Sequence, residues 1–179
     1  MRIIPRHLSL VLMLVLSGLS ASAEAEQTSL KAMIPWEGEG RVFQVAPDEL
    51  LFLGAFEGII YVETATGKLD EGFVRCPVSQ KITLKTKKTS ASGSCMITAS
   101  SEDTVYAQWT CIGQVGACRG EFKLTGGTGQ FKGVTGLSTF IVRSPLHALV
   151  AGMSGGNIVR VASGIAVLPE LKYEIPSNK

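Results

Sequence analysis

Histidine and closely spaced cysteines are scarce in this sequence, and their scarcity narrows the chemistry open to the chain. The 179 residues include two histidines, and His147 is the only one beyond the N-terminal segment. Four cysteines are present, but no C-x-x-C motif occurs. Zinc sites and dithiol redox sites need ligands or thiols at closer spacings. We therefore expect no metal site and no cofactor, and no partner residue identifies His147 as an acid or base.

An excess of charge of either sign is also missing. Charged residues make up 18% of the chain. Without Arg2 and Arg6 of the N-terminal segment, the 17 basic residues become 15, which equals the 15 acidic residues. A neutral protein has no general electrostatic attraction to nucleic acid or to anionic membranes. The composition therefore predicts no nucleic-acid partner.

No apolar run is long enough to cross a bilayer, which takes about 20 residues. The longest in the N-terminal segment, Leu8 to Leu16, ends near the small residues Ala21-Ser22-Ala23. A basic start, a short apolar run and small residues are typical of a cleaved secretory signal. We expect residues 1–23 to be this signal, with cleavage after Ala23 or, as second choice, Ala25. The mature protein is then exported, periplasmic or extracellular, with no stable membrane insertion.

Helix-length periodicity is rare, whereas alternation of apolar and polar residues is common. Residues 24–37 lack a clear period and are expected to be a flexible lead-in, and residues 38–179 to form one domain. A single short helix is expected from Ser144 to Gly152. About eight or nine strands with short turns predict an all-β, antiparallel eight-stranded barrel, closed or nearly closed, with a two-sheet sandwich as the alternative. The expected strands are 38–45, 50–63, 72–86, 92–99, 104–112, 121–125, 137–143, 158–168 and 171–175.

Glycines concentrate between residues 126 and 136, directly after the alternating strand 121–125. Glycine permits the positive φ and the bulges of a sharp turn, and Phe131 and Val134 are apolar groups that can plug the space beneath it. A phosphate-binding loop would need Lys followed by Ser or Thr and a helix, but Gly133 follows Lys132. We therefore expect a structural turn, whose residues are Gly126, Gly127, Gly129, Phe131, Gly133 and Gly136.

The same stretch, Gly-Gly-Thr-Gly-Gln-Phe-Lys-Gly-Val-Thr-Gly, resembles the hairpin motif of the allene oxide cyclase and dirigent-like barrel proteins. The resemblance implies an eight-stranded antiparallel barrel, often a homo-oligomer, with an apolar cavity for a small hydrophobic or phenolic compound. It covers the glycine-rich motif alone. No catalytic position of that family lies in a matched segment, so no catalytic residue is carried over.

An even number of cysteines in an exported chain predicts two disulfides, for which three pairings exist. If Gln114-Val115 is the tip of a hairpin, Cys111 and Cys118 lie directly opposite each other. Cys111–Cys118 is therefore our first pairing, which leaves Cys76–Cys95 across the preceding hairpin.

Four polar residues are candidates for a site, and they lie on or beside apolar strand faces. Glu57 interrupts the apolar segment 50–63, where a buried carboxylate would suit acid or base chemistry. The alternative is that Glu57 reaches solvent or pairs with Arg41 or Arg75. Polar side chains could also line a small-molecule cavity if their face points inward. The candidate ligand-binding residues are Glu57, Tyr61, Tyr106 and Gln108.

Lys85, Lys87 and Lys88 crowd one expected turn. They would suit an acidic ligand or surface, although exposed lysines more often serve solubility and discourage strand aggregation.

Three functions fit these observations. The first is a non-enzymatic barrel that binds a small hydrophobic or aromatic molecule. The second is an isomerase or cyclase of the allene oxide cyclase type, with Glu57 as acid or base. The third is a filled barrel that forms a homo-oligomer through an apolar outer strand. An empty cavity with a dry Glu57 would favour the second, and a filled barrel with Glu57 in solvent the third.

Overall fold

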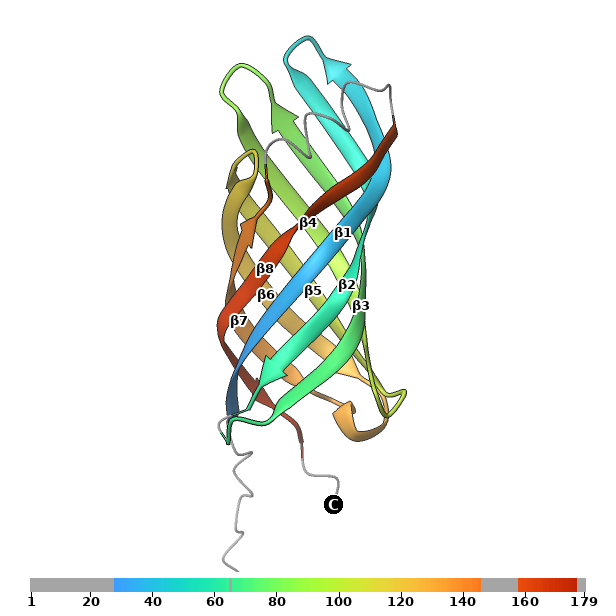
Figure 1. Ribbon diagram of the computed structural model, residues 1–179, viewed down its shortest axis with the longest axis vertical. Helices are drawn as coiled ribbons and strands as arrows, with labels where there is room; N and C mark the ends of the chain where they lie inside the picture. The colour runs from blue at the N-terminus through green and yellow to red at the C-terminus, as the bar shows by residue number, and fades with distance from the viewer. Residues whose placement is uncertain (1–27, 65, 146–157, 177–179) are drawn as a thin grey trace, which may run out of the picture.

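The computed structural model describes residues 28–64, 66–145 and 158–176. Each strand pairs antiparallel with the next, and the last pairs with the first, so eight strands close into one barrel (Figure 1). A single 3-10 turn, η1 (Gly129–Phe131), lies between β6 and β7. The predicted eight-stranded antiparallel barrel is confirmed. The strands are β1 (Thr28–Ala46), β2 (Glu49–Glu63), β3 (Leu69–Thr83), β4 (Lys88–Ala99), β5 (Thr104–Gln114), β6 (Ala117–Gly127), β7 (Thr135–Arg143) and β8 (Ile158–Glu174).

The barrel has two chemically different ends. The β1–β2, β3–β4 and β5–β6 turns lie at the upper end in Figure 1, and the β2–β3, β4–β5 and β6–β7 turns and both ends of the described chain lie at the lower end. Within the described ranges, no helix is long and apolar enough to span a membrane. The helix expected from Ser144 to Gly152, together with His147, falls outside the described residues beyond Pro145.

The first strand begins at Thr28, so the expectation of a flexible lead-in is wrong for residues 28–37. Ala32 and Ile34 are buried on the inner face, with Trp36 packed beside them. The outward positions Met33 and Pro35 are apolar as well, which hides the period of two in the sequence.

The last strand runs through Pro169, where the sequence predicted a break. Leu30 pairs with Leu171 and Ala32 pairs with Leu168, so two residues of β8 lie opposite one residue of β1. Such a bulge removes one ladder hydrogen bond, and a proline, which has no N–H, is tolerated there.

The glycine-rich turn after β6 packs against the core at the lower end of the barrel. Val134 is fully buried, and Phe131 packs against the core. The Thr104 N–H donates to Thr128 Oγ1 at 2.8 Å, which fastens this turn to the start of β5. Gly129 and Gly133 have φ of 50° and 77°, a region that favours glycine. The turn therefore positions a plug, as the sequence suggested.

Both predicted disulfides are present. Cys76–Cys95 joins β3 to β4, and Cys111–Cys118 joins β5 to β6. The expected register of the second was wrong, because the turn is Val115-Gly116, with Gly116 at φ 81°. Cys111 is paired with Gly120 rather than with Cys118, so this bridge runs diagonally across the hairpin with 5.6 Å between its Cα atoms.

Candidate functional site

A cavity of about 100 Å³ lies inside the barrel, between its middle and its upper end. Alternate residues of every strand point inward, so the strands themselves supply the lining. The lining is mainly apolar and includes small residues of β8 that leave space beside larger rings. Among the lining residues are Ala162, Ala166, Val142, Phe56, Trp109 and Phe140.

Aromatic rings fill most of the barrel at this level. Trp36 stacks on Phe56 with ring centroids 4.5 Å apart, and Phe56 lies 6.2 Å from Trp109. Trp109 in turn lies 5.2 Å from Phe140. The rings fit because Gly38 faces them without a side chain, and a Cβ there would lie 2.6 Å from Cδ1 of Phe56. The interior is therefore a packed aromatic core with a small residual space.

Gln80 and Thr89 are among the polar residues that line the upper part of this cavity. Gln80 Nε2 donates to Thr89 Oγ1 at 2.8 Å, and the buried Thr89 hydroxyl donates to the Lys81 carbonyl oxygen at 3.2 Å. Thr89 is therefore satisfied, whereas the Gln80 carbonyl oxygen accepts no hydrogen bond from the residues that the structure describes. Sequence reasoning missed this pair. The available signal was Gln80, a polar residue on the inward face that also carries Val78 and Ile82.

The size of the cavity limits what it can hold. Pockets for drug-sized ligands usually occupy about 300–1,000 Å³, and a dry engineered cavity of about 150 Å³ binds benzene. A space of about 100 Å³ therefore fits a compact molecule of at most one ring unless side chains move. A long or polycyclic substrate would require the aromatic core to rearrange.

Glu57 lies on the outer wall and not in a dry interior. It pairs across strands with Arg75, whose Nε donates to Glu57 Oε1 at 2.7 Å. The side chains of Glu57 and Arg75 are 46% and 54% exposed. The alternative in which Glu57 pairs with an arginine is therefore observed, and the interpretation as a buried acid or base is corrected. Alternation explains the result, because the neighbouring inward positions of β2 belong to Phe56 and Gly58.

The other three ligand-binding candidates also face outward. Tyr106 and Gln108 are exposed on β5, because Trp109 and Ala107 occupy its inward positions. Tyr61 and Glu57 line a broad depression of about 1500 Å³ on the outer wall over β1, β2 and β8. Tyr106 and Gln108 were candidates only if their face points inward, and this condition is not met, since the same period that buries Trp109 turns Tyr106 to solvent.

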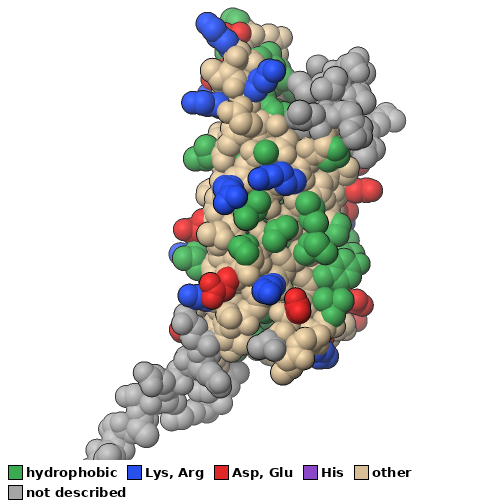
Figure 2. All heavy atoms as spheres, turned by 60° about the vertical axis from the view of Figure 1, so that its left-hand side comes forward, with side chains coloured by type: hydrophobic (Ala, Val, Ile, Leu, Met, Phe, Trp, Pro, Cys, Tyr) green, Lys and Arg blue, Asp and Glu red, His purple; other side chains and the backbone are tan. Residues whose placement is uncertain are grey.

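A second apolar surface lies on the outer wall. Met33 pairs with Val167, Val167 with Ile141, and Ile59 with Phe73, so apolar side chains adjoin across five strands. We call these residues, together with Ile165, the outer apolar band. Hydrophobic side chains gather across the middle of the face seen in Figure 2. Arg75 lies above the Phe73 ring at 5.8 Å, at the edge of this band.

All four cysteines are in disulfides, and none is free to bind metal. Among the residues the structure describes, no three His, Cys, Asp or Glu side chains gather where they could hold a metal ion. Comparison of the chain with models of known protein families, with curated proteins and with solved structures gave no match.

Proposed function

We propose that this protein is an exported, non-enzymatic barrel that binds one small apolar molecule, at most a single ring in size, inside its upper half. The observation that carries the proposal is the internal cavity of about 100 Å³ with its apolar lining. Apolar cavities of this kind stay dry and accept apolar guests, because water gains few hydrogen bonds there. The Gln80 carbonyl oxygen would accept a hydrogen bond from a guest that carries one donor.

Export is supported by two features. Two disulfides form and persist in oxidising compartments outside the cytoplasm, and residues 1–23 have the layout of a secretory signal. The inside of the barrel is apolar and its outer wall carries Glu57, Arg75 and other charges. Barrels that span membranes have a polar interior, unlike this one.

The cyclase hypothesis receives less support. Glu57, its proposed acid or base, is paired with Arg75 at 2.7 Å on the outer wall. The cavity is too small to fold a long-chain substrate without movement of the aromatic core. Membership of the allene oxide cyclase and dirigent-like family stays a prediction.

Benzene is a suitable first probe, because its size matches the space and it carries no polar group. At ten times its Kd, a ligand stabilises the folded state by about 1.4 kcal/mol. For a domain of this size that corresponds to an increase in Tm of about 3–5 °C. Chemical-shift changes in NMR spectra should be confined to methyl and aromatic groups around Ala162 and Ala166.

The matched variants are A166L and A55L. Ala166 is buried against the cavity, whereas Ala55 faces the outer depression, so the same added carbons fill the cavity in only one variant. We expect benzene to shift the Tm of the native protein and of A55L, but not of A166L. If A166L is too unstable to measure, A162L replaces it. No response of the native protein to benzene, or an unchanged response in a folded cavity-filled variant, would refute the proposal.

A second candidate function is homo-oligomerisation through the outer apolar band, favoured by the exposure of Met33, Ile59 and Phe73. Contiguous apolar surface is a common feature of protein interfaces. Sedimentation of the native protein and of F73S distinguishes the cases. A monomer at micromolar concentration in both would exclude this function, whereas an oligomer that F73S dissociates would support it.

A further inference from the structure

The upper end of the barrel carries exposed apolar side chains at its outermost points. The tips of the β1–β2 and β3–β4 hairpins project beyond the β5–β6 turn (Figure 1). Val45, near the first tip, is 53% exposed, and Leu84, in the second, is 42% exposed. Exposed aliphatic residues at two adjacent tips are unfavourable in water unless they contact something apolar.

Three basic residues lie in the same hairpin as Leu84, and Asp48 lies in the neighbouring β1–β2 turn. Lys85, Lys87 and Lys88 are exposed in the β3–β4 hairpin, and basic groups gather at this end in Figure 2. Within the described part of the chain, no carboxylate lies within 4.0 Å of their amino groups, whereas Lys81 is paired with Glu49 at 2.8 Å. We call Val45, Leu84, Lys85, Lys87 and Lys88 the hairpin-tip surface.

Backbone hydrogen bonds hold the hairpin-tip surface in shape. The Leu84 N–H donates to the Asp48 carbonyl oxygen at 2.8 Å, which joins the two tips. The Val115 N–H donates to the Lys87 carbonyl oxygen at 2.9 Å, which joins the β5–β6 turn to the same hairpin. A surface that is already ordered loses little conformational entropy on binding.

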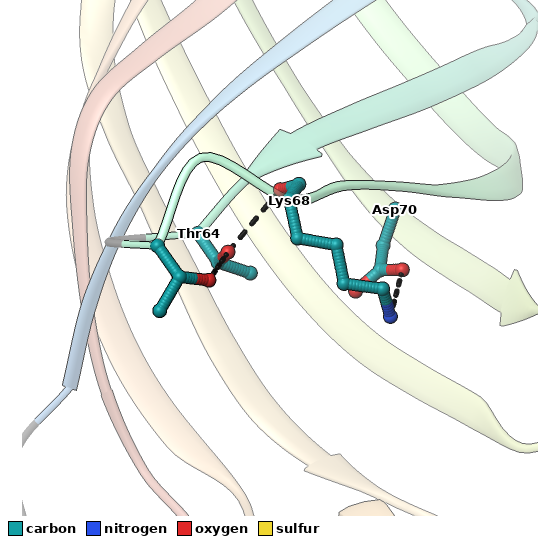
Figure 3. Close-up of polar contacts among 4 residues, drawn as sticks. Thr64, Lys68 and Asp70 are labelled. Atoms are coloured by element: carbon teal, nitrogen blue, oxygen red, sulfur yellow. Dashed lines mark hydrogen bonds and ion pairs between the residues drawn. The ribbon is translucent and has the colours of Figure 1, made fainter.

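The lower end of the barrel has a different charge pattern. Lys68 is paired with Asp70 at 2.8 Å, and Thr64 holds the same turn through the Lys68 carbonyl oxygen (Figure 3). Glu102 and Asp103 add negative charge at the β4–β5 turn of that end. Because of the three lysines of the β3–β4 hairpin, positive charge is more concentrated at the upper end than at the lower end.

From this combination we infer that the hairpin-tip surface docks reversibly on an anionic lipid surface. Lysines near such a surface are attracted to its headgroups, and exposed aliphatic side chains gain by entering the boundary between headgroups and acyl chains. Val45 and Leu84 favour lipid over a soluble polyanion, which offers them no apolar phase. Docking in this orientation turns the upper cavity lining, which includes Gln114 and Ser144, toward the lipid. The inference does not depend on ligand binding in the cavity.

Co-sedimentation with vesicles tests the inference. The purified protein is mixed with vesicles of equal parts phosphatidylglycerol and phosphatidylcholine, and with vesicles of phosphatidylcholine alone. We expect binding to the anionic vesicles that weakens at 0.5 M salt, because screening shortens the range of the attraction to about a few ångströms. Absence of binding to anionic vesicles at low salt, or equal binding to both compositions, would overturn the inference.

Two pairs of variants locate the contact. The triple variant K85Q/K87Q/K88Q should lower the vesicle partition coefficient on the order of 100-fold, about five-fold for each lysine. Its control, K31Q/K68Q/K132Q, makes the same change in total charge at sites outside the hairpin-tip surface and should have a much smaller effect. Equal losses in the two triple variants would mean that total charge matters and the hairpin-tip surface does not.

The apolar contribution is measured with L84S and its control L137S, which alters an exposed leucine of β7. We expect L84S to lower the partition coefficient about five- to ten-fold, in proportion to the apolar area it withdraws from lipid. L137S should leave it unchanged. If only the lysine variants lose binding, the contact is electrostatic alone, and the inference that Leu84 enters the lipid is wrong. Thermal unfolding of each variant verifies that the barrel is intact.

Discussion

The two disulfides should contribute unequally to stability, and their positions in the chain define the difference. Cys76–Cys95 has a sequence separation of 19 and Cys111–Cys118 one of 7. A cross-link restricts the unfolded chain more when it closes a longer loop. The chain-entropy relation gives about 3.3 kcal/mol for the first bridge and about 2.5 kcal/mol for the second at 25 °C.

The burial of the cysteines also predicts a larger loss of stability when Cys76–Cys95 is removed. Cys76 and Cys95 are both buried, whereas of the second pair only Cys111 is fully buried and Cys118 is partly exposed. Replacing a buried sulfur by hydrogen leaves space that the barrel fills incompletely, which adds to the loss. We therefore expect C76A/C95A to destabilise the protein more than C111A/C118A, by at least about 0.8 kcal/mol.

Urea unfolding followed by tryptophan fluorescence measures this difference, since Trp109 lies in the core. Reductant provides an internal control, because adding it to C111A/C118A should cause the loss attributed to the remaining bridge. Adding it to the native protein should cause the larger, combined loss. An equal or greater loss in oxidised C111A/C118A than in oxidised C76A/C95A would refute the argument from loop length and burial.

Three further substitutions test the interior and the outer wall, each by urea unfolding. G38A should lower the free energy of unfolding by about 1–3 kcal/mol, because its Cβ would lie 2.6 Å from a Phe56 ring that is stacked on Trp36. A decrease of less than about 0.5 kcal/mol would mean that the rings shift easily. T89V should lower the free energy of unfolding by about 1–3 kcal/mol, because it leaves the Gln80 amide and the Lys81 carbonyl oxygen without the Thr89 hydroxyl. The double variant Q80L/T89V should recover part of this loss. If it recovers none, the argument from the Gln80–Thr89 hydrogen bond is wrong. E57Q should cost less than about 1 kcal/mol, because the ion pair with Arg75 is exposed, and should leave benzene binding unchanged. Loss of benzene binding in E57Q would restore this residue as a site candidate.

Much of the barrel was predictable because strand alternation and turn chemistry act locally. The strands expected at 72–86 and 104–112 show apolar and polar positions that their burial then follows. The disulfide pairing followed from hairpin connectivity, since neighbouring strands bring their cysteines together. Pro169 shows the limit of this reasoning: a proline predicts a strand end, yet a bulge against β1 accommodates it.

The functional surfaces were less predictable. Alternation divides each strand into two faces but does not state which face is inside when both are apolar, as in β2. Tyr106 and Gln108 were therefore candidates for a cavity that they do not line, and Glu57 was a candidate for an interior although its side chain pairs with Arg75 on the outer wall. Gln80 and Thr89, which line the cavity, are nine residues apart in sequence and meet only through the register of β3 and β4.

By itself the sequence determined an all-β chain with two disulfides, a glycine-rich turn and a balance of charge beyond the N-terminal segment, because these depend on composition, spacing and nearest-neighbour geometry. Tertiary structure alone decided which faces point inward, how large the internal space is and which charges are neutralised. Closure of the sheet into a barrel determines which faces point inward and how large the internal space is, since the inward rings must share one fixed volume. Strand register determines which charges are neutralised, since it places Arg75 beside Glu57 and leaves three lysines at the upper end unpaired among the described residues.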